Sequence, residues 1–337
     1  MKLVCAMLLG FVLDLIFGDP HGLVHPVQII GWFIDKLKKG MQYLIYGCSY
    51  EEVKEKGIER KAGMEKAAGF FLMLFIVAGT YAVIYGMLYV AGMIHPLLRF
   101  CLETFFIYQI LATKSLKKES MKVYKKLKEG DLLGARKEVS YLVGRDTENL
   151  DESEVAKADV ETIAENTADG VIAPMLFIAL GGAPLGFAYK AVNTLDSMVA
   201  YRNDELIHIG FFSAKMDDIC NFVPARFAAV MMMLAAFFLR FDFKGAVRIF
   251  KRDRFAHLSP NSAQTEAVAA GALQIQLGGT HNYFGKAVVK PTIGDAIRPV
   301  EYEDIKRTNQ LLYVSAFLSM AVCTLITFLI YVQLFNV

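Results

Sequence analysis

The densest group of polar side chains that could do chemistry lies in the segment VETIAENTADGVIAP. Glu161, Glu165 and Asp169 are spaced i, i+4, i+8, which on a helix places three carboxylates along one face, with Asn166 beside them. Like charges repel at this spacing, and a shared cation would remove the penalty. Mg²⁺ is the natural candidate, because it prefers oxygen ligands and bridges one or two carboxylates to substrate phosphates. The alternative is a solvated acidic helix face.

A second polar group lies between two apolar runs, in residues 189–226. Such side chains are costly to bury without partners, so polar residues at a membrane edge are candidates for function. Arginine suits phosphate and carboxylate because its planar fork donates two parallel hydrogen bonds. The alternative is internal ion pairing, for example of Asp218 with Arg226. The candidates in this run are Asn193, Asp196, Ser197, Tyr201, Arg202, Asp217, Asp218, Asn221 and Arg226.

A third group, in residues 252–295, indicates phosphate recognition. Ser259 and the following proline have the pattern of a capped helix start. That helix would run from there through Glu266 to Leu277, before Gly278 and its neighbour end it. A helix N-terminus beside two arginines and His257 is an anion site. The glycine pair is not a P-loop, because no GKS or GKT follows. The alternative is a plain capped helix. The candidates here are Arg252, Arg254, Ser259, Asn261, Glu266 and Lys290.

The elements that must position these groups are mostly apolar. Of the 337 residues, 55% are hydrophobic and 21% charged, which is more apolar side chain than one soluble core needs. A net charge of +2 makes no case for a nucleic-acid partner. The five cysteines are far apart, so their spacing predicts neither a disulfide framework nor a CxxC metal site.

Two segments have the composition of transmembrane helices. Residues 67–94 carry no charge and exceed the roughly 20 residues that a span needs, and residues 311–334 are of the same kind. The basic stretches 36–66 and 114–137 should both face the cytoplasm. They share a side only if the chain returns across the membrane between them. We therefore expect a helical hairpin whose return is residues 97–112.

Three further apolar segments are less regular. Residues 3–17 contain Asp14, residues 171–191 are interrupted by proline and glycine, and residues 222–239 contain proline and arginine. Each could be a span, a re-entrant segment or a helix buried in protein. If both later segments crossed, the polar group between them would lie outside. We therefore expect these two to be re-entrant, or to meet in the bilayer plane around a cavity.

Helix is the expectation for the remaining chain. Residues 114–143 predict two amphipathic helices split at Gly130, and residues 152–168 predict another that stops at Gly170. No alternating pattern is long enough for a barrel. The predicted class is thus all-α, a polytopic integral membrane protein with transmembrane and re-entrant helices plus cytoplasmic amphipathic helices. Residues 1–337 are expected to form a single membrane-embedded domain.

These motifs together resemble the CobD/CbiB family of cobalamin biosynthesis, the adenosylcobinamide-phosphate synthases. Two positions depart from the family pattern: Ala200 stands where glycine is expected, and Lys215 where arginine is common. The matching blocks follow one another over nearly the whole chain: DLIFGDP with HPV (14–27), ETIAENTADGVIAP (161–174), GGAPLGFAYKAVNTLDSM with YRN (181–203), DDICNFVPAR (217–226), RDRFAHLSPNS with EAVAAGAL and QLGG (252–279), and KPTIGD (290–295).

The resemblance implies a multi-pass enzyme of the cell (cytoplasmic) membrane whose active site faces the cytoplasm. It would join adenosylcobyric acid to (R)-1-aminopropan-2-ol O-phosphate or ethanolamine phosphate through an amide bond, with ATP activating the corrinoid carboxyl and Mg²⁺ required. Its partners would be these small molecules and membrane lipid, without nucleic acid. An association with other membrane enzymes of the corrinoid pathway is left open.

The resemblance also suggests roles for the candidates. Glu161, Glu165 and Asp169 would hold Mg-ATP, with Asp196 as a further candidate. Asp217 or Asp218 would be a second metal ligand or the base. The groups that would grip phosphates are Arg202, Arg226, Arg254 and the helix start after Ser259, with Lys190, Lys286 and Lys290 as weaker candidates.

Two other classes remain as alternatives. The related AmpE-like membrane proteins of β-lactamase regulation are thought to sense rather than synthesise, and a sensor need not keep ordered acidic and basic positions. A transporter with carboxylates in its path predicts paired inverted repeats, and the sequence has none. Because unpaired polar groups are costly in apolar surroundings, their presence in every block favours the enzyme.

Overall fold

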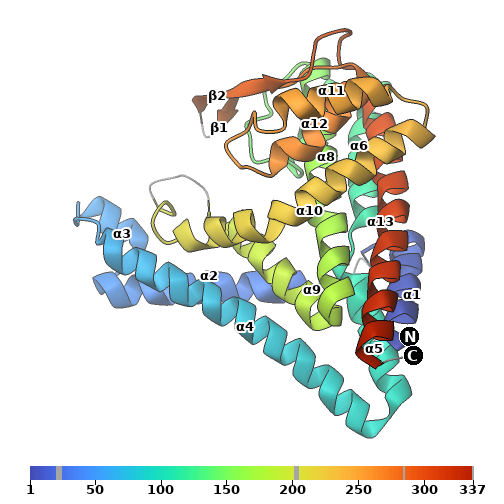
Figure 1. Cartoon of the computed structure of the whole chain (residues 1–337). Coiled ribbons are helices and arrows are strands. Elements are labelled where there is room, and N and C mark those ends of the chain that lie inside the picture. Colours follow the sequence, from blue (N-terminus) through green and yellow to red (C-terminus); the bar gives the residue numbers. More distant parts are fainter. Residues whose placement is uncertain (20–24, 201–204, 284, 336–337) are drawn as a thin grey trace. The chain divides into compact units, whose positions relative to one another are not determined.

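The computed structural model describes residues 1–19, 25–200, 205–283 and 285–335. It is almost wholly helical, which confirms the predicted all-α class (Figure 1). In the described part of the chain, strand pairing is confined to one antiparallel hairpin. The elements are α1 (Lys2–Phe17), α2 (Pro26–Tyr46), α3 (Tyr50–Glu55), α4 (Ala62–Ile94), α5 (Pro96–Ile110), α6 (Thr113–Lys128), α7 (Leu132–Ser140), α8 (Glu152–Asn166), η1 (Thr167–Ile172), α9 (Ala173–Val199), α10 (Phe211–Phe238), α11 (Phe243–Asp253), α12 (Ser262–Leu273), β1 (Leu277–Tyr283), β2 (Lys286–Ile293) and α13 (Glu303–Phe335).

Four helical stretches among the described residues are long and apolar enough to cross a membrane. They are Ala62–Ile94, Glu152–Val199, Phe211–Phe238 and Glu303–Ile330. The two expected spans lie in the first and last of these, and the two interrupted segments lie in the middle pair. Helix α5, the expected return, has 15 residues. At about 1.5 Å per residue it reaches roughly 22 Å, less than the ~30 Å hydrocarbon core, so α5 alone is too short to span.

Helix α9 is broken where its sequence carries glycine and proline. Gly181 and Gly182 have non-helical backbone angles, with φ +67° at Gly182, and Pro184 follows inside the helix. An L side chain rarely adopts that φ, so glycine permits the break. Gly182 is buried, and irregular backbone at membrane depth is tolerated where protein covers it. The interruption is as expected, and whether the segment re-enters stays a prediction.

The chain packs as two compact units, neither of which is continuous in sequence. The first comprises Met1–Gly10, Pro20–Ile110 and Leu176–Cys220. Here α2 and α4 lie side by side, joined through α3, and α4 turns into α5 at the extended residue His95 (Figure 1). Buried Glu65 is held at the α2–α4 junction by an ion pair with Arg60 and by the Tyr46 hydroxyl, which donates to it at 2.6 Å.

The second unit comprises Phe11–Asp19, Leu111–Met175 and Asn221–Val337. Asp14, the charge that interrupts the first apolar run, is fully buried, and its Oδ2 accepts from the Thr113 amide at 3.0 Å at the start of α6. Helices α6 and α7 are split at Gly130 as predicted, and Asp131 caps α7. Helices α11 and α12 cross closely, since a Cβ on Gly271 would lie 2.4 Å from the Gly245 carbonyl oxygen.

Two helix ends differ from the sequence prediction. The helix expected to stop at Gly170 instead passes through the π-helical turn η1 into α9. The helix expected to be capped by Ser259 and to end at Gly278 starts at Ser262 and ends at Leu273, where Gln274 adopts the left-handed conformation. Gly278 and the following residue instead begin strand β1, which pairs with β2 across a bulge. The prediction failed there because a glycine pair serves a bulge as well as a helix end.

Candidate active site

Helix α8 supplies the first two carboxylates of the site, all of which lies in the second unit. Asp151 begins the helix with a capping box, and one face packs into the core through residues such as Val160 and Ile163. Glu161 and Glu165 stand one turn apart on the half-buried face. Asp169 follows in the π-helical turn η1, directly after α8, and is also half-buried. Glu161 and Glu165 thus lie on one face as expected, and the addition of Asp169 to this row stays a prediction.

Glu161 ties α8 to strand β1. Its Oε2 forms an ion pair with Arg145, and the two side chains are only 12% and 6% exposed. Its Oε1 accepts from the Gly278 amide at 2.7 Å, and Lys157 donates to the carbonyl of the same glycine. The Arg145 guanidinium also lies 2.8 Å from the His281 ring nitrogen Nδ1. Burial and then the Arg145 charge lower the pKa of His281 to about 4, so this imidazole is neutral at physiological pH.

A third carboxyl joins the site from α12. Glu165 Oε1 accepts from the Ser262 hydroxyl at 2.7 Å, and Glu266 lies one turn further along α12 and is 6% exposed. Burial, and then the charges of Glu165 and Glu161, raise the pKa of Glu266 well above its ordinary value, while Lys290 acts in the opposite direction. Burial also lowers the pKa of His257, opposed chiefly by Glu165. The carboxyls of Glu165 and Glu266 thus lie close to the imidazole of His257 and the ammonium of Lys290.

Two arginines lie together beside this group. Arg226 donates to the Asn261 side chain at 3.2 Å and to the Phe222 carbonyl at 2.6 Å, and its guanidinium stacks 3.6 Å from the Phe222 ring centre. Arg254 stacks on two aromatic rings, and its buried Nε has no hydrogen-bond partner among the residues that the structure describes. The two cations are close enough to interact. Such a pair could receive an anionic group.

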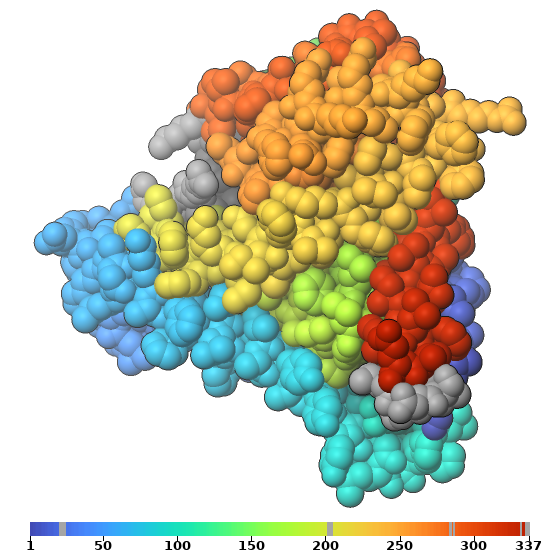
Figure 2. Space-filling view, viewed as in Figure 1, coloured from blue at the N-terminus to red at the C-terminus, as the bar shows by residue number. Residues whose placement is uncertain are grey.

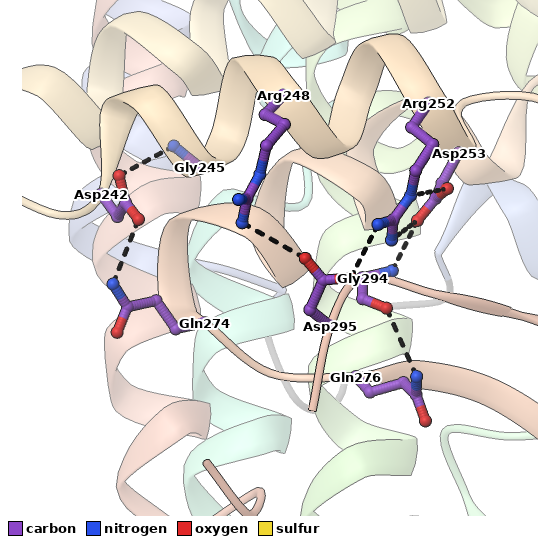
Figure 3. Close-up of polar contacts among 9 residues, drawn as sticks. All are labelled: Asp242, Gly245, Arg248, Arg252, Asp253, Gln274, Gln276, Gly294 and Asp295. Carbon is purple, nitrogen blue, oxygen red and sulfur yellow. Dashed lines mark hydrogen bonds and ion pairs between the residues drawn. The ribbon is translucent and has the colours of Figure 1, made fainter. Parts of the chain in front are cut away.

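Arg252, expected to grip phosphate, connects two segments through ion pairs (Figure 3). Its guanidinium nitrogens donate to Asp253 at 2.7 and 2.8 Å and to Asp295 at 2.7 Å. Asp253 in turn accepts from the Gly294 amide at 2.7 Å. Through these contacts with two carboxylates, Arg252 holds the KPTIGD segment against α11, and its expected role in phosphate binding stays a prediction.

The remaining predicted residues are distributed over both units. Ser259 does not cap α12, but its hydroxyl accepts from the Asn261 amide at 3.3 Å. Asn166 donates to the Thr162 carbonyl at 2.9 Å, and Asn221 is buried on α10. Tyr201 and Arg202 lie outside the described residues. The candidates that belong to the first unit are Lys190, Asn193, Asp196 and Ser197 on α9 and Asp217 and Asp218 on α10.

Comparison with known proteins shows what this chain is related to. A family model described as CobD/Cbib protein matches residues 7–312. The chain belongs to the CobD/CbiB family. "Cobalamin biosynthesis protein CobD" of Clostridium perfringens (strain 13 / Type A) is 48% identical over 320 residues, covering 95% of this chain and 96% of that protein. The CobD of Streptococcus sanguinis (strain SK36) is 45% identical with the same coverage. "Cobalamin biosynthesis protein CbiB" of Salmonella choleraesuis (strain SC-B67) is 42% identical over 319 residues, with coverage of 95% and 96%. No solved structure matches.

Within this CobD/CbiB chain, sequence reasoning missed three side chains of the site. Lys157 lies four residues before Glu161, so the i, i+4 spacing could have revealed it. Arg145 lies in the loop before α8 and His281 lies in β1, and no motif marks either of them. Arg145 meets Glu161 through the fold of the loop before α8. His281 reaches Arg145 only because the hairpin folds back on α8, a contact between segments more than 100 residues apart.

The oxygen atoms of the site show how a magnesium ion could fit. Both Glu161 oxygens are engaged, by Arg145 and by the Gly278 amide, and one Glu165 oxygen accepts from Ser262. No group of three or more His, Cys, Asp or Glu in the described part of the chain is placed to hold a metal ion. The arrangement fits a magnesium that arrives with phosphates and takes one or two carboxylates. The full set with Asp169 stays a prediction.

Proposed function

We propose that this chain acts in cobalamin biosynthesis as an adenosylcobinamide-phosphate synthase, an ATP-dependent ligase that forms a carbon–nitrogen amide bond. It would join adenosylcobyric acid to (R)-1-aminopropan-2-ol O-phosphate or ethanolamine phosphate. The observation that carries the proposal is the grouping of Glu161, Glu165 and Glu266 with cationic side chains. Support also comes from the relatives, which are named cobalamin biosynthesis proteins.

Each group has a task in amide formation. ATP with Mg²⁺ would supply the phosphoryl group that turns a carboxylate oxygen into a leaving group. Glu165 would position the metal, and Arg226 and Arg254 would neutralise phosphate charge, since such reactions are catalysed mainly by positioning and electrostatics. The ammonium would release one proton to solvent. Glu266, which burial keeps protonated, would give its proton to the departing phosphate and regain one from the nitrogen. The amine nitrogen then forms the bond to the carbonyl carbon, and phosphate departs with the carboxyl oxygen.

A coupling assay tests the activity directly. Purified protein in detergent would be mixed with adenosylcobyric acid and each amino-alcohol phosphate, and the corrinoid product followed by mass. We expect product with ATP and magnesium and none when either is left out or magnesium is chelated. The amine that gives faster turnover is the preferred substrate. No product with either amine, from folded protein that binds the corrinoid, would favour an AmpE-like sensory role.

We also propose that the protein resides in the cytoplasmic membrane with its active site toward the cytoplasm. Ile207, in the turn before α10, is half exposed and suits cysteine labelling after the five native cysteines are replaced. Because the apolar segments around it are proposed to be re-entrant, Ile207→Cys should react with impermeant maleimide in inside-out vesicles, as Glu129→Cys in the basic stretch should. Labelling of Ile207→Cys only from outside would overturn this topology.

A further inference from the structure

The first unit contains an apolar groove that the proposed reaction does not use. Its volume is about 440 Å³, and it lies among α2, α4, α5 and α9. Buried side chains such as Ile30, Ile84 and Phe106 form its floor, whereas Phe33 and Phe75 on its walls are about half exposed, at 47% and 65%. In Figure 2 the side chains of α4, in cyan, lie open along the helix. The groove is therefore open to whatever surrounds the protein.

The position of the groove along α4 indicates its surroundings. Its α4 wall extends from Phe75 to Met87, within the uncharged residues 67–94. Twelve steps of about 1.5 Å give roughly 18 Å, close to one leaflet of a ~30 Å hydrocarbon core. At that depth in the bilayer, the molecules that can occupy the groove are the acyl chains of lipids. A corrinoid carries many amide groups, and this lining, with Thr80 as its polar side chain, offers them few partners.

The α2 end of the groove has the chemistry of a membrane interface with a positive charge. Trp32 packs edge-to-face on groove residue Phe33, with ring centres 4.9 Å apart, and the Lys36 ammonium lies 5.9 Å from the centre of the Trp32 ring. Tryptophan is typical of the headgroup level, and lysine there attracts anionic lipid. Lys38 and Lys39 are paired with carboxylates, at 3.0 and 2.8 Å. Lys36 is thus the lysine of this turn suited to meet a lipid phosphate.

We propose that the groove binds one acyl chain of an anionic phospholipid, with the lipid phosphate at Lys36. The lipid would fill the space between α2 and α4 and so stabilise the first unit. This site does not depend on the synthase reaction, and its test needs no substrate.

A larger side chain at Gly79 can fill the groove without a clash. Gly79 lines the groove, and a Cβ there would meet nothing within 4 Å. Gly86 lies on the same helix with equally open space but does not line the groove, so Gly86→Leu is the matched control. Each variant would be purified from nanodiscs of phosphatidylglycerol or phosphatidylcholine and examined by native mass spectrometry. We expect wild type and Gly86→Leu to retain one phosphatidylglycerol.

Gly79→Leu should retain roughly tenfold less lipid, because the leucine displaces about two methylenes of the acyl chain. Lys36→Gln should remove the preference for phosphatidylglycerol over phosphatidylcholine. Equal retention by Gly79→Leu and wild type, or a second copy of the chain in place of lipid, would overturn the proposal. If Gly79→Leu does not fold, Val83→Trp fills the same groove from another wall position. An unchanged headgroup preference in Lys36→Gln would refute the phosphate position.

Discussion

Glu165→Gln is expected to reduce amide synthesis about 100-fold or more, to background, while the protein remains folded in detergent. The glutamine has the same volume and can still accept from the Ser262 hydroxyl, which now donates to Glu165 at 2.7 Å. What it loses is the negative charge, which positions the cation that accompanies phosphate. The loss should therefore appear in turnover, measured as corrinoid product per enzyme, and the melting temperature should change little.

A matched substitution on the same helix gives the control. Glu152 lies exposed in the first turn of α8, and Glu152→Gln should retain wild-type turnover because it removes an equal charge away from the site. Wild-type turnover in Glu165→Gln would remove the α8 carboxylates from the mechanism. Loss in both variants would point to a general effect of helix charge instead.

The parts of this molecule that sequence reasoning could predict are those governed by local patterns. The uncharged run in α4 predicts a span because any helix in hydrocarbon needs about 20 apolar residues. The spacing of Glu161 and Glu165 predicts a shared face because α-helical periodicity is local. The π-helical turn η1, which contains Asp169, was not predicted, because no local sequence pattern marks such a turn, although π-helical turns are frequent at functional sites.

The parts that could not be predicted depend on contacts between distant segments. Strand β1 contains a glycine pair at positive φ directly after its first residue, Leu277. Such a pair is by itself also a helix-stop signal, and only pairing with β2 makes the segment a strand. Arg145 acquires its partner Glu161 through folding of the loop before α8. Arg252 was assigned to phosphate because of its neighbours in sequence, yet its partner Asp295 lies 43 residues away.

Glu266→Gln should have opposite effects on activity and on stability. As the proposed acid that protonates the departing phosphate, Glu266 is worth about 100-fold or more in rate, because general acids contribute on that scale. Burial raises its pKa well above the ordinary 4.5. Between those two values the folded protein holds a proton that the unfolded chain has released, so rising pH lowers the stability of the native state. Glutamine cannot ionise, so the Glu266→Gln variant does not lose this stability as the pH rises.

The variant should therefore melt at a higher temperature than wild type at pH 8, and the difference should shrink as the pH falls toward about 4.5, where the unfolded chain is protonated too. Thermal melts of both proteins between pH 4.5 and 8 would measure this difference in melting temperature, with turnover followed in parallel. Glu148→Gln, an exposed acid in the loop before α8, should leave both quantities unchanged. A merely structural Glu266 would change the melts without the loss of turnover. Full activity of Glu266→Gln would instead remove Glu266 from the mechanism.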